Sequence, residues 1–523
     1  MQDSVMAARP CKAVMSPYYD NMKNRSIIVT LAALLLAGTG SAQQNYKRIH
    51  NKMLDEAKYH LEVKEYMDAA KIYQQLLPVD TSFLEVRYEL ALSLSRIPKL
   101  RHQALHHFET CVRAGHTEAH IEYAKAQHEQ QRFDEAIALY EKYKQIHYRA
   151  VNDAEVDRRI AMSRKAKQLV ASPIEVAVNS MGPAVNSRMH DYSPLVTADG
   201  RTMYFTSRRE GSTGGLRDAE GQYMEDVYVS HRTDEGWSPA VNIGEPINSM
   251  VQDATVGLSP DGNSMILYRT SRALVSGDLY ECRRTGDGGW GAPELMTEKI
   301  NSASHEPSAN IAPNGEEIYF TSDRPGGFGG RDLYRIRRLP NGEWSLPLNL
   351  GPNINTPYDE DAPFLHSDGK TMFFSSNGHA TMGGYDVFKS TLLDADMNLW
   401  SEPENMGYPL NTVDDDIYFT LSEDGRTGYI SSERPEGMGE QDIYEVIFPS
   451  AVVEAGTRPQ WLVTMTDDSW FGPWTGPYQH LGIAKVRAAE EGLPIVRAAN
   501  TGVSAIIDPY GRLVTTLGLD ESG

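Results

Sequence analysis

The segment Ala312-Pro313-Asn314-Gly315-Glu316-Glu317-Ile318-Tyr319-Phe320-Thr321-Ser322-Asp323-Arg324 represents a pattern that recurs along this chain. It joins an Asn-Gly pair to a short apolar and aromatic run. Glycine tolerates positive φ, so the pair favours a tight hairpin turn, and the run after it is typical of a β-strand. The five Asp/Asn-Gly pairs lie 62, 53, 54 and 56 residues apart. They begin at Asp199, Asp261, Asn314, Asp368 and Asp424.

Each repeat continues with a Gly-rich loop and a strand such as Asp332–Ile336. Four strands in each repeat are typical of a β-propeller blade. The repeats resemble the PD40 class of WD40-like repeats, and the resemblance covers all five units. The second unit is degenerate, because Leu267-Tyr268-Arg269-Thr270 replaces an aromatic residue followed by Thr-Ser. Four units place a tryptophan on a further strand: Trp237, Trp290, Trp344 and Trp400.

The segments that link the repeats predict how the ring closes. Asn349–Thr356 and three similar linkers end the first four repeats, whereas the last repeat lacks one and a fifth copy, Asn179–Ser187, precedes the first. An unpaired edge would leave backbone groups unsatisfied. We therefore predict five blades over residues 172–449, closed by pairing of Ile174–Val178 with the last blade. The similar linkers are Asn242–Ser249, Leu295–Ser302 and Asn405–Thr412.

Acidic residues open the blades. They could ring a cation site, but turn capping and a solvated acidic face are the interpretation that the sequence favours. Ser, His and Asp also occur here, yet none lies in a nucleophile-elbow context. We predict no catalytic residue, metal or cofactor in this region. The acidic residues are Asp191, Asp253, Glu306, Asp359-Glu360-Asp361 and Asp414-Asp415-Asp416.

Residues 46–170 contain a second repeat. Glu65–Tyr73 recurs as Arg132–Tyr140 at an offset of 67 residues, and Gln103–Phe108 between them has the same small-x-x-x-aromatic spacing. Residues four positions apart share one helix face, so helices can approach closely at the small residue. The pattern resembles tetratricopeptide repeats, which implies about three helical pairs, a final helix near Asp153–Val170 and a concave surface for a peptide or partner helix. An ordinary helical bundle is the alternative.

Composition limits the function further. Of 523 residues, 71 are acidic and 50 basic, giving a formal net charge of -21, whereas nucleic-acid binding needs clustered positive charge. Cys11, Cys111 and Cys282 are too scattered for a disulfide framework or a cysteine metal site. Three histidines lack an acidic or cysteine partner at ligand spacing and are expected on a solvated helix face. They are His102, His106 and His107.

Residues 1–42 are predicted to direct export. Residues 1–21 look like an extension that precedes the signal. A charged segment, the apolar run Ile27–Ala37 and small residues up to Ala42 then follow in order, as in a signal peptide cleaved after Ala42. The run is too short to span a membrane, which disfavours the alternative of a membrane anchor. The mature protein is expected to be exported and to lack disulfides.

The sequence changes character from Tyr444. Trp461–Gly472, Gly476–His480, Ala484–Glu490 and Arg497–Ala505 follow in order. They resemble the C-terminal part of the nitrilase-like (CN hydrolase) domain of apolipoprotein N-acyltransferase. The resemblance implies that residues 444–523 form a partial α/β fragment in the order strand, loop, helix, strand. Half of such a sandwich lacks the partner of one sheet face, so we expect weak packing and aggregation.

This resemblance also implies which chemistry is missing. The family uses a Cys nucleophile, a Glu base and a Lys, and its Cys directly precedes a Tyr-Glu pair. Here Ile443, which has no lone pair to attack with, precedes Tyr444-Glu445. The Glu/Lys half and the membrane spans are also missing, and Lys485 lies in the later helix. The resemblance therefore predicts an inactive remnant that matches the family only at Tyr444 and Glu445.

The junction at Asp442–Val446 fits both the last propeller strand and the edge of the acyltransferase motif. Two unrelated genes could have been joined there, in nature or in assembly. A genuine domain swap with a binding role is the alternative.

Helical repeats followed by a PD40 propeller, behind a signal peptide, resemble periplasmic proteins of Bacteroidetes-type bacteria. These belong to the OmpA-like family and include an outer-membrane-associated component of the type IX secretion machinery. The resemblance implies a non-enzymatic, periplasmic, outer-membrane-associated scaffold that binds proteins through its helical groove and propeller faces, with no nucleic-acid partner and no membrane span. In the relatives a peptidoglycan-binding OmpA-like domain follows the propeller. This chain departs from that pattern after its repeats, so cell-wall anchoring is in doubt. The alternative function is lipoprotein N-acylation, which the tail alone would suggest.

Overall fold

The structure is a computed structural model. It describes residues 40–77, 84–97, 99–147, 149–218, 222–271, 276–453, 462–466, 481–486, 488, 495–499, 503–508 and 510–517. The chain divides into two compact units, Met1–Ser422 with Thr427–Pro449 and Glu423–Arg426 with Ser450–Gly523. Most of the predicted signal peptide, 1–39, lies outside the described residues. None of the helices in the described ranges is long and apolar enough to cross a membrane.

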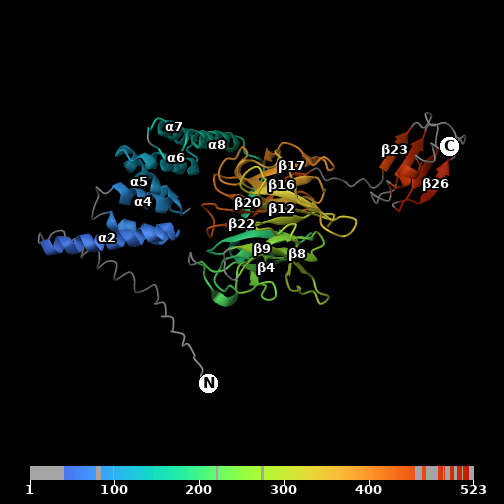
Figure 1. Cartoon of the computed structure of the whole chain (residues 1–523), viewed down its shortest axis with the longest axis horizontal. Helices are drawn as coiled ribbons and strands as arrows, with labels where there is room; N and C mark the ends of the chain where they lie inside the picture. The colour runs from blue at the N-terminus through green and yellow to red at the C-terminus, as the bar shows by residue number, and fades with distance from the viewer. Residues whose placement is uncertain are drawn as a thin grey trace, which may run out of the picture. The chain divides into compact units, whose positions relative to one another are not determined.

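Helices occupy the N-terminal part of the first unit, as the sequence predicted (Figure 1). The small and aromatic residues that define the sequence pattern face inward, because Ala69, Tyr73, Ala104 and Phe108 are all buried. The predicted final helix is also confirmed. The helices described here are α2 (Gly40–Glu62), α3 (Tyr66–Leu76), α4 (Leu84–Ser95), α5 (Arg101–Arg113), α6 (Thr117–Glu129), α7 (Phe133–Lys144) and α8 (Asp153–Ala171).

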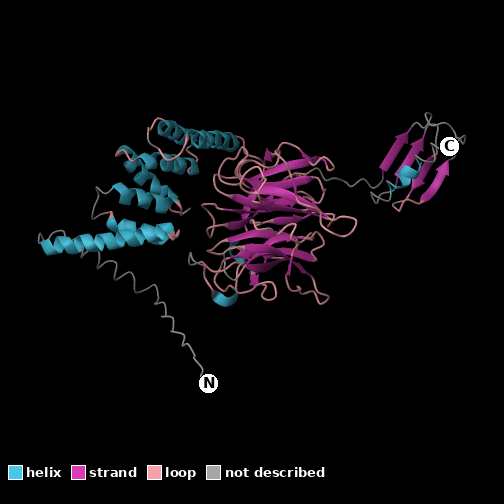
Figure 2. Cartoon of the chain, viewed as in Figure 1, coloured by secondary structure: helices cyan, strands magenta, loops and turns pink. Residues whose placement is uncertain are grey.

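Five antiparallel sheets follow the helices in the first unit (Figure 2). The first contains β2 (Asp191–Val196), β3 (Thr202–Ser207), β4 (Asp226–Thr233), β5 (Gly236–Trp237) and β6 (Val241–Asn242). The second contains β7 (Asp253–Leu258), β8 (Ser264–Thr270), β9 (Gly277–Arg283) and β10 (Glu294–Leu295). The third contains β11 (Ala309–Ile311), β12 (Glu317–Ser322), β13 (Asp332–Arg337) and β14 (Leu348–Asn349).

The fourth sheet contains β15 (Glu360–Leu365), β16 (Thr371–Ser376), β17 (Asp386–Asp394), β18 (Leu399–Trp400) and β19 (Glu404–Asn405). The fifth contains β20 (Asp416–Leu421), β21 (Thr427–Ser432), β22 (Asp442–Ile447) and, from the start of the region, β1 (Ala177–Ser180). A short helix α9 (Gly182–Val185) and a 3-10 turn η1 (Thr213–Gly215) lie in the loops. Trp237 and Trp400 lie on strands as predicted, while Trp290 and Trp344 form single bridges with Arg284 and Arg338.

In each sheet the predicted glycine turn joins the first strand to the second. The glycine of every Asp/Asn-Gly pair has a positive φ, between 66° and 70°, which side chains with a Cβ rarely adopt. The turn therefore fixes where the first strand ends and the second begins. The glycines are Gly200, Gly262, Gly315, Gly369 and Gly425.

The first strands of the sheets contact one another in sequence order: β2 with β7, β7 with β11, β11 with β15 and β15 with β20. Strand β20 in turn contacts β2. The predicted pairing of the early segment with the last sheet is confirmed, with Ala177 opposite Ile447 and Val178 opposite Val446. The predicted limits, Ile174–Val178, lie too early, because the Ile174 amide donates to the Tyr408 carbonyl at 2.7 Å and does not join the sheet.

The second unit has one described sheet, in the order β23-β24-β25-β26. Parallel pairing of β23 (Leu462–Thr466) with β24 (Ile495–Ala499), with helical residues 481–486 between them in sequence, confirms the predicted order of strand, helix and strand. Strands β25 (Ser504–Ile507) and β26 (Leu513–Leu517) complete the sheet. A small buried core includes Leu481, Ala484 and Ile495. That the unit packs weakly stays a prediction.

Candidate functional site

Ile443, which the sequence resemblance aligns with the acyltransferase nucleophile, is the second residue of β22 and is fully buried. Its N–H donates to Oδ1 of Asn186, and the Asn186 side-chain amide donates to its carbonyl oxygen, both at 2.9 Å. The other four sheets repeat this arrangement at the aliphatic residue that follows an aspartate in the strand, with distances of 2.8–3.0 Å. The pairs are Val227 with Asn248, Leu279 with Asn301, Leu333 with Asn355 and Val387 with Asn411.

Tyr444 and Glu445, which the sequence matched to the acyltransferase motif, also have their side chains in contact with residues of the sheets. The guanidinium of Arg434 lies 5.0 Å from the centre of the buried Tyr444 ring. Glu445 accepts hydrogen bonds from the Tyr429 hydroxyl at 3.2 Å and from Arg232 at 3.1 Å. Burial, together with the charge of Asp442, raises the pKa of Tyr444. Ile443, Tyr444 and Glu445 are therefore consecutive residues of one strand, and their contacts are with other residues of the sheets.

The acidic residues that open the sheets are buried caps. Each carboxylate accepts the backbone N–H of the residue four positions earlier, at 2.5–3.1 Å. The predicted capping is confirmed, but a solvated acidic face is wrong for these residues, because the preceding linker and strand enclose them. They are Asp191, Asp253, Glu306, Glu360 and Asp416.

An arginine pairs with the capping acid in four sheets, for example Arg209 with Asp191 at 2.6 Å and Arg324 with Glu306 at 3.3 Å. Glu360 has Gly378 at the corresponding position, and burial raises its pKa to about 7. No cluster of three or more acidic, histidine or cysteine side chains within the described ranges could hold a metal ion.

The three histidines predicted on a solvated helix face differ in their exposure to solvent. His102 and His106 are exposed, but His107 is half-buried with its ring nitrogen 3.3 Å from Arg87. Burial, with Arg87 beside the ring, lowers the pKa of His107 to about 4. The solvated-face prediction is therefore wrong for His107, because the side chain packs against the neighbouring helix.

A polar cavity that sequence reasoning missed lies between the helices and the fourth and fifth sheets, within the first unit. This junction cavity has a volume of about 320 Å³. Its lining residues include, from the helices, Arg96, Arg101, Lys125, Arg158 and Arg159, and from the sheets, Asp414, Asp415 and Glu433. The helix side is therefore mainly basic and the sheet side acidic.

Direct contacts fasten the two sides of the junction cavity. Arg101 Nη1 lies 2.5 Å from Asp414 Oδ1. The buried His128 donates from Nε2 to the carbonyl oxygen of Met382 at 2.9 Å, and burial lowers its pKa to about 4. Phe133 and Met382 belong to one apolar cluster across the junction. These contacts hold the helices and the sheets in one unit.

Glu433 is an acidic residue of this cavity whose raised pKa predicts that the stability of the fold depends on pH. Burial, followed by repulsion from Asp415 and Asp414, raises its pKa to about 7. Because the pKa of Glu433 is raised in the folded state, its protonated carboxyl contributes to stability at low pH. This stability is lost as the pH rises through 7, because the buried carboxyl must then ionise.

We expect Glu433→Gln to leave stability unchanged at pH 4 and to raise it by about 1–3 kcal/mol at pH 8. Urea unfolding at both pH values measures the difference. Glu343→Gln on an exposed loop is the matched control and should change stability little at either pH. An effect of Glu433→Gln that is the same at both pH values would contradict the assignment.

Comparison with known proteins places a family at one end of the chain. Residues 431–523 match the family model Carbon-nitrogen hydrolase. Over 80 residues the chain is 58% identical to the apolipoprotein N-acyltransferase of Rhodopseudomonas palustris and 59% identical to that of Bradyrhizobium diazoefficiens. Each match covers 15% of this chain, and the chain spans only 15% of the length of these relatives. The start of the family match, 431–447, overlaps the end of β21 and includes all of β22 in the fifth sheet.

Solved structures give weak likenesses to the larger part of the chain. A glycosyl hydrolase from Bacteroides ovatus has a TM-score of 0.35 and 11% identity, with 50% of this chain and 85% of that chain covered. The β-1,2-mannobiose phosphorylase from Listeria innocua has a TM-score of 0.36 and 6% identity, with 53% and 97% covered. Neither likeness defines a fold or an activity for this chain.

Proposed function

We propose that the first unit is a non-enzymatic protein-binding scaffold, built from tetratricopeptide-type helical repeats and a five-bladed PD40-type β-propeller. The cyclic order of contacts between the first strands and the pairing of β1 with β22 support a closed ring of blades. The buried contacts at the junction cavity support a fixed arrangement of helices and blades. One composite surface would then be available to partners.

The observation that carries the non-enzymatic proposal is the place of Ile443. The fifth sheet uses this residue, with Asn186, as the other four sheets use their own aliphatic residues. The Tyr444 ring packs against Arg434, and Glu445 is hydrogen-bonded to Tyr429 in the same sheet. Chemistry on the acyltransferase pattern would need a reactive thiolate at a position that is fully buried by neighbouring strands.

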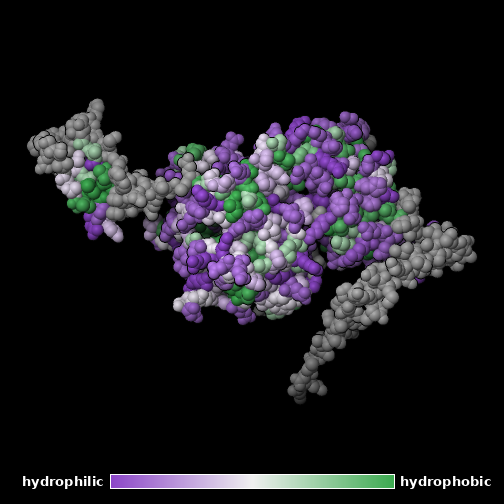
Figure 3. All heavy atoms as spheres, turned by 180° about the vertical axis from the view of Figure 1, so that it is seen from behind, coloured by the Kyte–Doolittle hydropathy of each residue, from purple (hydrophilic) through white to green (hydrophobic). Residues whose placement is uncertain are grey.

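The proposed partners are proteins of the envelope or of a secretion assembly, and the proposed location is the periplasm near the outer membrane. Hydrophilic residues cover most of the described surface seen in Figure 3. The net charge of -21 favours basic partners and steers their approach.

Complementation of a strain depleted of its apolipoprotein N-acyltransferase tests the enzymatic alternative. Neither the full chain nor its Ile443→Cys variant is expected to restore growth, because burial would disfavour the thiolate, as it does for the buried Cys282, whose pKa is raised to about 12. A plasmid-borne acyltransferase is the positive control. Rescue by the chain itself would overturn the proposal.

Photo-crosslinking tests the scaffold directly. A photoreactive residue in place of Met67 on the helices or Leu346 on the sheets, which are 45% and 74% exposed, is expected to give discrete protein adducts in the cell envelope. The same residue in place of the buried Phe205 is the control and should give none. An exported chain without adducts from either exposed position would contradict a scaffold role.

A further inference from the structure

The same contact occurs between two pairs of neighbouring sheets. In each pair, a tyrosine of one sheet contacts a tryptophan and an arginine of the other. Tyr204 of β3 lies 5.9 Å from Trp290, edge to face, and its hydroxyl is 2.5 Å from Arg284 Nη2. Tyr429 of β21 stands in the same relation to Trp237, at 6.3 Å, and to Arg232 Nη1, at 3.4 Å. The tyrosine follows its turn glycine by four residues in both sheets.

The tyrosine is missing between the second and third sheets. Four residues after the turn glycine Gly262 stands Ile266, a shorter side chain without a ring or a hydroxyl. The arginine and tryptophan of the third sheet are nevertheless present. The Arg338 guanidinium lies 4.2 Å from the centre of the Trp344 ring, the same distance as Arg284 from Trp290.

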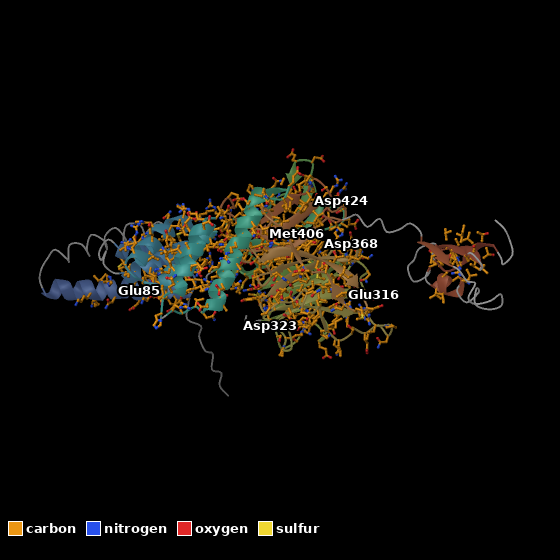
Figure 4. The ribbon with its side chains drawn as sticks, turned by 90° about the horizontal axis from the view of Figure 1, so that it is seen from above. Glu85, Glu316, Asp323, Asp368, Met406 and Asp424 are labelled. Atoms are coloured by element: carbon orange, nitrogen blue, oxygen red, sulfur yellow. The ribbon has the colours of Figure 1, made fainter. Side chains whose placement is uncertain are left out.

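A cavity of about 690 Å³ lies at this place. Ile266, Arg338 and Trp344 are among its lining residues, and we call it the Trp344 cavity. It is larger than the junction cavity, and its rim includes Leu295, which is 60% exposed. Figure 4 labels Glu316, which follows the turn at Asn314-Gly315 on this rim and whose carboxylate lies 4.0 Å from Arg338 Nε.

The hydrogen bonds of the two arginines show which donor is left over. Arg338 Nη1 donates to the Gly342 carbonyl at 3.1 Å, as Arg284 Nη1 donates to the Gly288 carbonyl at 2.7 Å. Arg284 then uses Nη2 for the Tyr204 hydroxyl. For Arg338 Nη2, no hydrogen bond to any described residue corresponds to that one.

We propose that the Trp344 cavity receives a tyrosyl side chain of a partner protein, in the place that Tyr204 and Tyr429 take at the other contacts. An aromatic ring edge to face with Trp344 and a hydroxyl that accepts from Arg338 would reproduce both halves of the internal contact. The apolar lining at Leu295, Met296 and Ile311 suits a ring better than a fully polar ligand. That the ring comes from a partner protein rests on the proposed scaffold function, whereas the chemistry of the cavity does not.

Titration of the full chain with N-acetyl-L-tyrosinamide, followed by saturation-transfer NMR of the probe, tests the cavity. We expect binding of this probe and about tenfold weaker binding of N-acetyl-L-phenylalaninamide, which lacks the hydroxyl. Ile266→Tyr should fill the cavity from inside, abolish binding and raise the melting temperature. Trp290→Phe, at a contact already filled by Tyr204, is the matched control and should leave binding unchanged.

Arg338→Gln provides a second test that does not depend on how well Ile266→Tyr packs. It should remove the preference for the tyrosine probe over the phenylalanine probe. The proposal is overturned if the tyrosine probe does not bind, if Arg338→Gln keeps the preference, or if N-acetylglucosamine binds in its place. Probe binding without any crosslinked envelope partner would support the cavity and count against the scaffold function, so the two failures are distinguishable.

Discussion

Arg101→Ala is expected to lower the free energy of unfolding of the first unit by about 3–5 kcal/mol, because it breaks one buried ion pair. Arg101 Nη1 and Asp414 Oδ1 are 2.5 Å apart, and the two side chains are only 9% and 11% exposed. Without the guanidinium, the Asp414 carboxylate stays in a site where burial already raises its pKa. The loss should therefore exceed the value of an exposed pair.

Urea unfolding followed by circular dichroism measures the loss, and hydrogen exchange locates it. We expect faster exchange first at the helix side of the junction cavity, in α5 and α6, since Arg101 begins α5. Arg113→Ala is the matched control on the same helix. Its partner is Glu109, and with Arg113 77% exposed the change should cost less than about 1 kcal/mol.

A double variant separates the pair from its surroundings. Replacing Arg101 and Asp414 together by leucine removes the unpaired charge, so the double variant should be more stable than Arg101→Ala alone. If Arg101→Ala cost no more than Arg113→Ala, the ion pair would not fasten helices to sheets, and the composite surface of the proposed scaffold would lose its main support.

The repeats were predictable because their signals are local. A glycine at positive φ specifies each turn within a few residues, and the spacing from Ala69 to Tyr73 specifies which helix face is buried. The extra linker copy at Asn179–Ser187 predicted the closing pair, since a count of linkers needs no coordinates. Only the ends of the closing strand were misplaced.

The junction cavity was not predictable for the opposite reason. Arg101 and Asp414 are 313 residues apart, and no periodic pattern relates a helix start to a linker of the fifth sheet. Within Asp414-Asp415-Asp416, the capping role belongs to Asp416 and the contact with Arg101 to Asp414. Three consecutive carboxylates carry no local signal that separates these roles, because register decides which one enters the sheet.

The position of Ile443 could have been read more fully from the sequence. Asp442-Ile443-Tyr444 follows the same order of acidic, aliphatic and aromatic residues as Asp226-Val227-Tyr228 and Asp332-Leu333-Tyr334. In the structure the aliphatic member is the one that bonds the linker asparagine. The similarity of Tyr444-Glu445 to an acyltransferase motif therefore coincides with a repeat that explains these residues without catalysis.

Asn186→Ala is expected to cost about 3 kcal/mol, because it leaves both the N–H and the carbonyl of the buried Ile443 without their partner. Asn186 belongs to the segment that starts the sheet region, whereas Ile443 lies 257 residues later in the fifth sheet. Loss of this contact should therefore also release β1 from β22, with faster hydrogen exchange at Glu445 and Ile447, whose N–H groups lie on the β1 side, and new protease cleavage near residues 177–186.

Asn355→Ala is the matched control, since Asn355 bonds Leu333 in the same way but only 22 residues away, within one continuous repeat. It should cost about as much stability while the exchange of Glu445 and Ile447 stays slow. Equal exchange in both variants would mean that β1 does not depend on Asn186 for its place, and that backbone pairing with β22 alone closes the set of sheets. Faster exchange in Asn186→Ala alone would show that the Asn186 side chain holds the start of the sheet region against the fifth sheet.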